Sequence, residues 1–307
     1  MLSGQRIGVT GATGMLGRYL MASLRARGAE PVGVVRSPDK PPSLGAQGYS
    51  MRRADLADMP SLAKAFEGLD AVMANASVIA LGGHRPAEVL RTNIDGVRNT
   101  FEAMARAGVK RAVMTSTSVA YVPRRGHRYV ESDPLRALGG FLHRFNCYAV
   151  SKAEAERVAR EICARSGIAL SIARPHQILG AFDQTGFTRW FRLLMSPRWI
   201  SVWPVFWRYP SVYAGDLSEA MCRMLERDAA AGEAFNVTGE PGRDSYWDHL
   251  LAYRAAGQRV PKVVIPVPFP ARHEYSIEKA QRILDFKPRT LVESFRDLVS
   301  IEEAQRV

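Results

Sequence analysis

A glycine-rich loop near the start of the chain constrains the fold more than any other feature. Gly11, Gly14 and Gly17 are spaced three residues apart, between an apolar run over 6–9 and an amphipathic run over 15–27. The first run is typical of a short buried strand and the second of a helix. Glycine permits the tight turn, lets the main chain approach a phosphate and lets helix and strand pack closely. The loop therefore predicts a dinucleotide pyrophosphate at the amino end of the helix.

Composition limits the class of protein. The chain has 307 residues, of which 47% are hydrophobic, enough for one large domain or two modest ones. It shows no apolar run of about 18 residues and no charged-then-apolar leader, so we expect a cytoplasmic protein with no membrane partner. Cys147, Cys163 and Cys222 are far apart and lack paired ligand spacing. We therefore expect reduced thiols and no metal site.

The charge balance is strongly basic. A formal net charge of +12 is compatible with nucleic acid, with an anionic membrane, or with an anionic cofactor and substrate. The arginines are scattered rather than gathered in blocks of like charge, and no known nucleic-acid-binding motif is present. We expect a small-molecule partner, and the sequence does not favour nucleic acid.

Apolar strands alternate with amphipathic helices through the first half of the chain. Strands are predicted over 6–9, 31–35, 49–52, 71–74, 111–115 and 169–173. This alternation is typical of an α/β fold with a Rossmann-type, doubly wound parallel sheet. Two later apolar runs, at 212–216 and 235–237, are expected to rejoin the sheet. The predicted division is a dinucleotide-binding domain over 1–175, rejoined by about 206–238, and a smaller C-terminal substrate-binding region over 176–205 and 239–307.

An aromatic and basic segment follows. Residues 187–213 hold four of the five tryptophans together with four arginines. Such a segment packs a small second domain, walls a substrate pocket, or lies on a membrane surface. Core packing is the commonest of these, and the nearby nucleotide-binding loop favours the pocket wall as the alternative.

Tyr148 and Lys152 stand near the start of a predicted helix that runs to Ser166. Four residues is about one helical turn, so the phenol and the ammonium project from the same face. A nearby cation favours tyrosinate, so we expect it to lower the pKa of Tyr148 from its usual value of about 10. Such a phenol is a general acid or base for a carbonyl and alcohol pair.

A cluster of hydroxyls, Thr115 to Ser118, ends one predicted strand. At the carboxyl edge of the sheet such a hydroxyl can hold a substrate oxygen beside the tyrosine. The alternative is a loop of small polar residues.

Together these features resemble the extended short-chain dehydrogenase/reductase family. This group contains nucleotide-sugar epimerases and dehydratases, dihydroflavonol reductases and 3β-hydroxysteroid dehydrogenases. The resemblance covers nearly all of the chain. Further matching motifs are Asp55-Leu56, Thr92-Asn93-Ile94-Asp95-Gly96-Val97, Arg174-Pro175, Asp216-Leu217 and Phe286-Lys287-Pro288-Arg289.

The resemblance implies roles for matching residues. Tyr148 would be the catalytic acid/base, Lys152 would tune it and bind the nicotinamide ribose, and Thr117 would be the active-site hydroxyl, with Ser116 as the alternative. Cofactor contacts would come from Thr10, Gly11, Thr13, Gly14, Met15, Leu16, Gly17, Arg36, Lys40, Asp55, Leu56, Ala74, Ala76, Thr115, Tyr148, Lys152, Pro175 and Ile178. Substrate contacts would come from Ser118, His176, Gln177 and Trp190. Asn93 is expected to be structural, and a homodimer is implied through the helices near Asn93 and Tyr148.

The end of the second strand favours NADP(H) over NAD(H). An acidic side chain there would accept both ribose hydroxyls of NAD and repel a 2′-phosphate. This chain instead carries Arg36, which can pair with a 2′-phosphate and stack on adenine. Pro38 carries Asp39 past the strand end, so Asp39 does not restore the NAD pattern.

Departures from the family pattern reduce the number of reactions that this chain is expected to catalyse. Dehydratases carry an Asp-Glu pair after the active-site threonine, whereas Ser118 and Val119 stand here, which argues against dehydration. Epimerases usually place asparagine where this chain has Gln177, which weakens an epimerase function. We predict a reductase or dehydrogenase acting on a ketone, an aldehyde or a secondary alcohol, with a partly apolar or aromatic substrate. The alternatives are an epimerase, a non-catalytic NADP-binding sensor and an RNA-associated member of the family.

Overall fold

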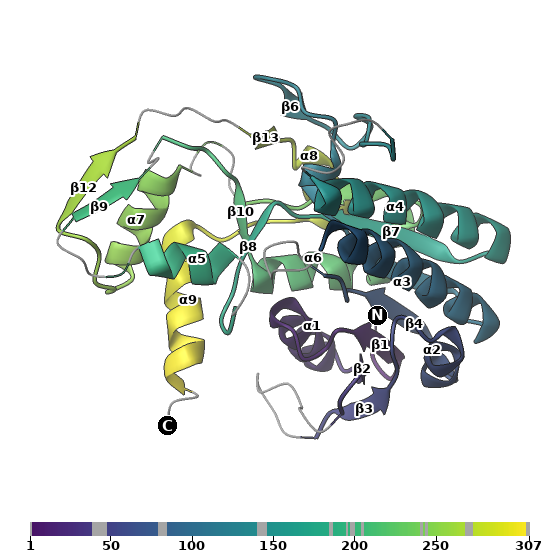
Figure 1. Cartoon of the computed structure of the whole chain (residues 1–307). Coiled ribbons are helices and arrows are strands. Elements are labelled where there is room, and N and C mark those ends of the chain that lie inside the picture. Colours follow the sequence, from purple (N-terminus) through teal and green to yellow (C-terminus); the bar gives the residue numbers. More distant parts are fainter. Residues whose placement is uncertain are drawn as a thin grey trace.

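A parallel sheet at the centre of the molecule collects the strand ends on which the predicted motifs lie (Figure 1). The computed structural model describes residues 2–38, 48–78, 85–139, 146–183, 187–194, 196, 200–203, 206–239, 242, 245–267 and 273–304. The sheet consists of β1 (Arg6–Thr10), β2 (Glu30–Val35), β3 (Ser50–Arg53), β4 (Ala71–Ala74), β5 (Arg111–Thr115), β7 (Ala169–Arg174) and β11 (Ala234–Asn236). Its seven strands lie in the order β11-β7-β5-β4-β1-β2-β3, and all neighbours are parallel. The predicted Rossmann-type fold class is confirmed.

Helices cover both faces of this sheet. They are α1 (Met15–Ala26) and α6 (Ala214–Glu226) on one face, and α2 (Met59–Phe66), α3 (Pro86–Arg106) and α4 (Cys147–Ser166) on the other. Side chains along each strand alternate between the two buried apolar clusters. On β5, for example, Val113 joins the cluster with α1 and α6, while Ala112 and Met114 join the other. This alternation is the two-residue period of a strand buried on both faces.

The six predicted strands all form, with bounds that agree to within one residue. The run at 235–237 joins the sheet as β11 beside β7. The run at 212–216 does not join it: residues Ser211–Tyr213 form β10, which pairs with β8 (Gln177–Leu179) in a separate two-stranded parallel sheet. The reason is local, because β8 follows closely after β7 and its own backbone groups pair with β10.

The β8–β10 pair leads into a smaller lobe, which lies beside the Rossmann part in Figure 1. Its elements are α5 (Phe187–Leu194), β9 (Ile200–Trp203), α7 (Tyr246–Ala255), β12 (Val263–Pro266) and α9 (Leu291–Ala304). They surround their own apolar cluster, which includes Phe191, Tyr246 and Phe295. Part of the aromatic segment after Phe187 therefore packs the core of this lobe, which is one of the roles expected for it.

Five further elements complete the described part of the chain. They are η2 (Ser118–Ala120), β6 (Arg128–Tyr129), η4 (Asp228–Ala230), β13 (Glu274–Tyr275) and α8 (Glu278–Leu284). Helix α8 falls within the range predicted for the smaller region, yet it packs on α6 and β11 of the Rossmann part. The predicted domain limits stay a prediction.

Candidate active site

The glycine loop turns directly from β1 into α1. Gly11 has a φ of +68°, a conformation that L side chains rarely adopt. A Cβ added at Gly11 would lie 3.1 Å from the Ala76 Cα, and one at Gly17 would lie 2.7 Å from the Ala12 Cα. Because Gly14 is the N-cap of α1, no capping side chain covers the first amides of the helix. The loop therefore fits a dinucleotide pyrophosphate, which binds main-chain amides and the positive end of a helix.

Thr10 ties this loop to the end of β4. Its Oγ1 accepts hydrogen bonds from the backbone amides of Asn75 at 3.0 Å and Ala76 at 3.1 Å. The strand ends carrying Thr10 and Ala74 are thus brought together, as the cofactor prediction requires. Met15, also predicted to contact the cofactor, lies beside Gly180, the residue that follows β8.

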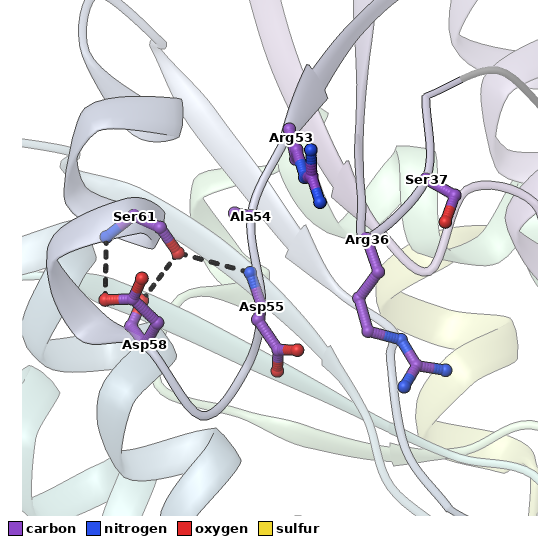
Figure 2. A pocket seen from close by; sticks show the side chains of 7 residues that line it. All are labelled: Arg36, Ser37, Arg53, Ala54, Asp55, Asp58 and Ser61. Carbon is purple, nitrogen blue, oxygen red and sulfur yellow. Dashed lines mark hydrogen bonds between the residues drawn. The ribbon is translucent and has the colours of Figure 1, made fainter.

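A cavity of about 630 Å³ opens at the ends of β2 and β3 (Figure 2). It is lined by Arg36, Ser37, Arg53, Ala54, Asp55, Asp58 and Ser61. Asp58 caps α2 through its bond from the Ser61 amide, and the Ser61 hydroxyl accepts from the Asp55 amide at 3.2 Å. These bonds hold the acidic wall of the cavity in place. Leu56, by contrast, packs beside Gly96 of α3.

Two arginines line this cavity, although the sequence singled out only one. Arg53 ends β3 and is adjacent to Val35, so it lies next to Arg36 across the two strands. Both side chains are exposed. The sequence feature that could have identified Arg53 is the pair Arg52-Arg53 at the end of a strand. Of these two, Arg52 donates to the Ala65 and Glu67 carbonyls, so Arg53 is the one that lines the cavity. Lys40, predicted to contact the cofactor, lies outside the described residues.

The hydroxyl cluster follows β5. The Thr115 hydroxyl donates to Asn75 Oδ1 at 3.2 Å, and Thr117 is the N-cap of η2. Ser116 Oγ is buried and has no hydrogen-bond partner among the described residues. A buried hydroxyl without a partner is costly unless something else satisfies it, so Ser116 stays beside Thr117 as a candidate.

Lys152 joins α4 to this strand end. Its side chain is 2% exposed, and its ammonium donates to the Thr115 carbonyl at 2.6 Å. Burial lowers the pKa of Lys152 to about 8, and the nearby Glu156 carboxylate acts in the opposite direction. Helix α4 also packs against η2, so the tyrosine–lysine turn and the hydroxyl cluster share one edge of the sheet.

The direction predicted for the pKa of Tyr148 was wrong. Burial raises the pKa of Tyr148 to about 12, because a tyrosinate would lose its hydration there. The ammonium of Lys152 is instead engaged by the Thr115 carbonyl. At neutral pH the phenol therefore holds its proton.

Asn93 has the structural role that the sequence predicted. Its amide pairs with both backbone groups of Val78, at 2.8 and 3.0 Å, and its Nδ2 also donates to Ser151 Oγ at 3.0 Å. Ser151 immediately precedes Lys152. Asn93 thus connects the segment after β4 to the tyrosine–lysine turn of α4.

A buried ion pair anchors α4 to the end of β7. Arg174 contacts Glu156 through three hydrogen bonds of 2.6 to 3.2 Å, and its other nitrogen donates to the Tyr121 hydroxyl. Both charged side chains are at most 4% exposed. The next residue, Pro175, accepts a hydrogen bond from the Ser118 amide at 2.8 Å. The Arg174-Pro175 motif therefore sets the distance between β7 and η2.

Beyond this motif, His176 stands in an aromatic cluster that the sequence largely missed. Its Nδ1 lies 2.8 Å from Ser118 Oγ and 3.3 Å from the Tyr275 hydroxyl. Its ring stacks near Tyr209 and His273, with centroids 5.4 and 5.5 Å away. Burial, reinforced by His273, lowers the pKa of His176 to about 3. No local pattern could have found Tyr209, His273 or Tyr275, because they come from distant segments.

Of the other predicted substrate contacts, the structure describes the side chain of Gln177 but not that of Trp190. Gln177 Nε2 donates to the Tyr246 hydroxyl at 3.5 Å, whereas its Oε1 is buried without a partner in the described part of the chain. Ile178, predicted as a cofactor contact, is half-buried on β8 beside it. Trp190 lies on α5, but its side chain is outside the described residues.

Two expectations concern features away from the site. Over the described ranges, no group of three His, Cys, Asp or Glu side chains could hold a metal ion. None of the described helices combines the length and the apolar character that crossing a bilayer requires.

The predicted homodimer would form through α3 and α4. No described large apolar side chain is exposed on these two helices, and the homodimer stays a prediction.

The sequence is similar to known reductases and dehydrogenases. It is 31% identical to cinnamoyl-CoA reductase 1 of Petunia hybrida over 194 residues, which is 60% of this chain and 57% of that protein. It is 28% identical to a 3β-hydroxysteroid dehydrogenase/Δ5→4-isomerase of Mycobacterium tuberculosis over 277 residues, 86% of this chain and 72% of that protein. The chain thus spans little more than half the length of the petunia relative.

Solved structures of both reductases and epimerases share the fold. Yeast methylglyoxal/isovaleraldehyde reductase Gre2, complexed with NADPH, has a TM-score of 0.81 at 19% identity, covering 99% of this chain and all of that one. UDP-N-acetylglucosamine 4-epimerase from Bacillus cereus has a TM-score of 0.79 at 20% identity, covering 99% and 97%. The model of the NAD dependent epimerase/dehydratase family matches residues 7–238. The glycine loop, the strand-end hydroxyls and the tyrosine–lysine turn all lie within this match, and the chain belongs to that family.

Proposed function

We propose that the protein is an NADP(H)-dependent oxidoreductase that moves a hydride between the nicotinamide and a ketone, an aldehyde or a secondary alcohol. The observation that carries this proposal is the hydrogen bond from the Lys152 ammonium to the Thr115 carbonyl. It joins the tyrosine–lysine turn to the strand end that carries the hydroxyls, at the carboxyl edge of the sheet where the glycine loop also lies. The cofactor, when bound, supplies or accepts the hydride.

The proton would come from Tyr148. With a pKa of about 12, the phenol is protonated at neutral pH and is ready to donate to the alkoxide that forms as a carbonyl is reduced. Thr117 would orient the substrate oxygen, with Ser116 as the alternative hydroxyl. The ammonium of Lys152 would hold the nicotinamide ribose and favour the tyrosinate that is left after proton transfer.

The aromatic cluster supports a substrate with an apolar or aromatic surface. Tyr209, His273 and Tyr275 surround His176, and flat rings of this kind stack on planar or apolar groups. A neutral His176 whose Nδ1 accepts from Ser118 carries its proton on Nε2, which is then a donor for a substrate oxygen.

Two arginines support NADP(H) over NAD(H). Arg36 and Arg53 line one cavity from neighbouring strands and can pair with a 2′-phosphate from two sides. Asp55, on the same cavity, would contact the adenosine end of the cofactor. Lys40 remains a proposed contact from its place in the sequence.

The test is NADPH oxidation over a panel of aldehydes and ketones that includes aromatic members, together with NADPH binding by fluorescence. We expect turnover for at least one aromatic carbonyl compound and tighter binding of NADPH than of NADH. Tight NADPH binding without turnover on any compound would favour the non-catalytic sensor instead.

An epimerase is the second candidate, and one observation favours it. Gln177 stands at the position where epimerases hold the sugar phosphate, and its buried Oε1 lacks a partner among the described residues. An amide oxygen in that state is able to accept from a sugar hydroxyl. Interconversion of two nucleotide sugars, with no net consumption of cofactor, would establish this function in place of the reductase.

A further inference from the structure

The outer surface of the smaller lobe carries a flat apolar face. Strands β9 and β12 pair in parallel, with Ile200 beside Val263 and Val202 beside Ile265. These four side chains are 43 to 61% exposed, and Phe206, close in sequence, is 59% exposed. The strand period of two puts the members of each strand on the same face. We call the four strand side chains the β9–β12 face.

The opposite side of this small sheet is covered. Val264 lies between two members of the β9–β12 face and packs instead into the lobe core with Tyr246 and Leu250 of α7. In Figure 1, β9 and β12 lie at the end of the lobe far from the central sheet. Parallel strands are normally buried on both faces, so a parallel pair with a bare apolar face points to a missing cover.

The charge around this face indicates what covers it. The stretches of sequence that contain β9 and β12, 184–215 and 249–273, each hold four Arg or Lys residues and no Asp or Glu. Among these cations Arg192 pairs with Glu302 of α9, while Arg254 and Arg259 are exposed on the stretch leading to β12. An apolar face within stretches of sequence that carry only cationic charge has the composition of surfaces that lie on anionic lipid. A second copy fits less well, because each chain carries a net charge of +12.

We propose that the β9–β12 face docks on an anionic lipid bilayer, with its apolar side chains at the level of the headgroups and the flanking cations against lipid phosphates. Such docking needs no spanning helix, because the face lies on the membrane rather than across it. It departs from the expectation, based on the lack of a long apolar run, that the chain has no membrane partner. The proposal does not depend on which reaction the active site performs.

The test is co-sedimentation of the full chain with lipid vesicles. One set is phosphatidylcholine alone and the other contains about 30% phosphatidylglycerol, each at low and high salt. We expect binding only to the anionic vesicles, weakened by salt. The double variant Val202→Glu/Ile265→Glu should bind about ten-fold more weakly or not at all, because charge is costly at the headgroup boundary.

Val122→Glu/Val130→Glu is the matched control. It adds the same charge at two apolar side chains that are 37 and 41% exposed outside the smaller lobe, and it should bind like the unaltered chain. Thermal unfolding of both variants must match, so that a loss is not misfolding. No binding of the unaltered chain to anionic vesicles, or equal losses in both variants, overturns the proposal. A dimer that only Val202→Glu/Ile265→Glu dissociates, without vesicle binding, assigns the face to a second copy.

Discussion

The Rossmann part and the smaller lobe use their side chains in different ways. In the Rossmann part, the candidate groups sit at strand ends or first helical turns, and each belongs to a short motif such as Thr10 to Gly17 or Tyr148 to Lys152. The cluster about His176 brings in Tyr209 from one distant segment and His273 and Tyr275 from another. The residues proposed to bind the cofactor thus come from local sequence patterns, whereas those proposed to contact the substrate are brought together by tertiary packing.

The largest effect expected in the Rossmann part is on turnover. Replacing Tyr148→Phe removes the proposed proton donor and should lower kcat by about 10²–10⁴-fold, the usual contribution of a general acid. NADPH binding should change little. Steady-state kinetics and fluorescence titration measure the two separately. The same change at Tyr253, which packs against Phe295 in the smaller lobe, is the control. Unchanged turnover in Tyr148→Phe would refute the proton-transfer role.

The free energy of unfolding tests the buried ion pair that links α4 to β7. Glu156→Ala leaves Arg174 buried without its partner, so the free energy of unfolding should fall by about 3–5 kcal/mol. Glu161→Ala, on the exposed face of the same helix, should cost less than about 1 kcal/mol. Urea unfolding of both variants measures the difference. Similar values for the two would mean that the buried pair does not anchor the site.

Cofactor preference tests the cavity at the ends of β2 and β3. Arg36→Asp should weaken NADPH binding by about ten- to hundred-fold, the size of a lost charge-assisted hydrogen bond, and spare NADH. Arg53→Asp should act in the same direction. Fluorescence titration with each cofactor measures the ratio. An unaltered ratio in both variants would place the 2′-phosphate elsewhere.

The smallest expected effect is a pH dependence of stability at His176, a proposed substrate contact. Burial lowers the pKa of His176 from 6.5 to about 3, so between these values the unfolded chain binds more protons than the folded chain. Stability should therefore rise as pH increases from about 3 to 6.5, with this histidine contributing about 1–3 kcal/mol. His176→Asn should flatten that part of the curve of unfolding free energy against pH. A curve of unchanged slope would mean that the ring is hydrated.

Prediction from the sequence worked where short-range pattern decides the structure. The alternation of strands and helices was sufficient for the sheet, because buried parallel strands and their crossover helices leave an unmistakable apolar period. It failed for Val212, whose apolar run looks like any other buried strand although it pairs with β8. It also failed for the pKa of Tyr148, because spacing from a lysine says nothing about burial or about the carbonyl that Lys152 contacts.

By itself the sequence determined the fold class, the turn at Gly11, the arginine at the end of β2 and the tyrosine–lysine turn. All of these depend on residue type and on spacings of a few residues, which the backbone period converts directly into position. Only the tertiary structure decided that Arg53 lies beside Arg36, that Ser118 and Tyr275 hold His176, and that β9 and β12 expose a bare apolar face. Those contacts join residues far apart along the chain, and packing alone sets which of them meet.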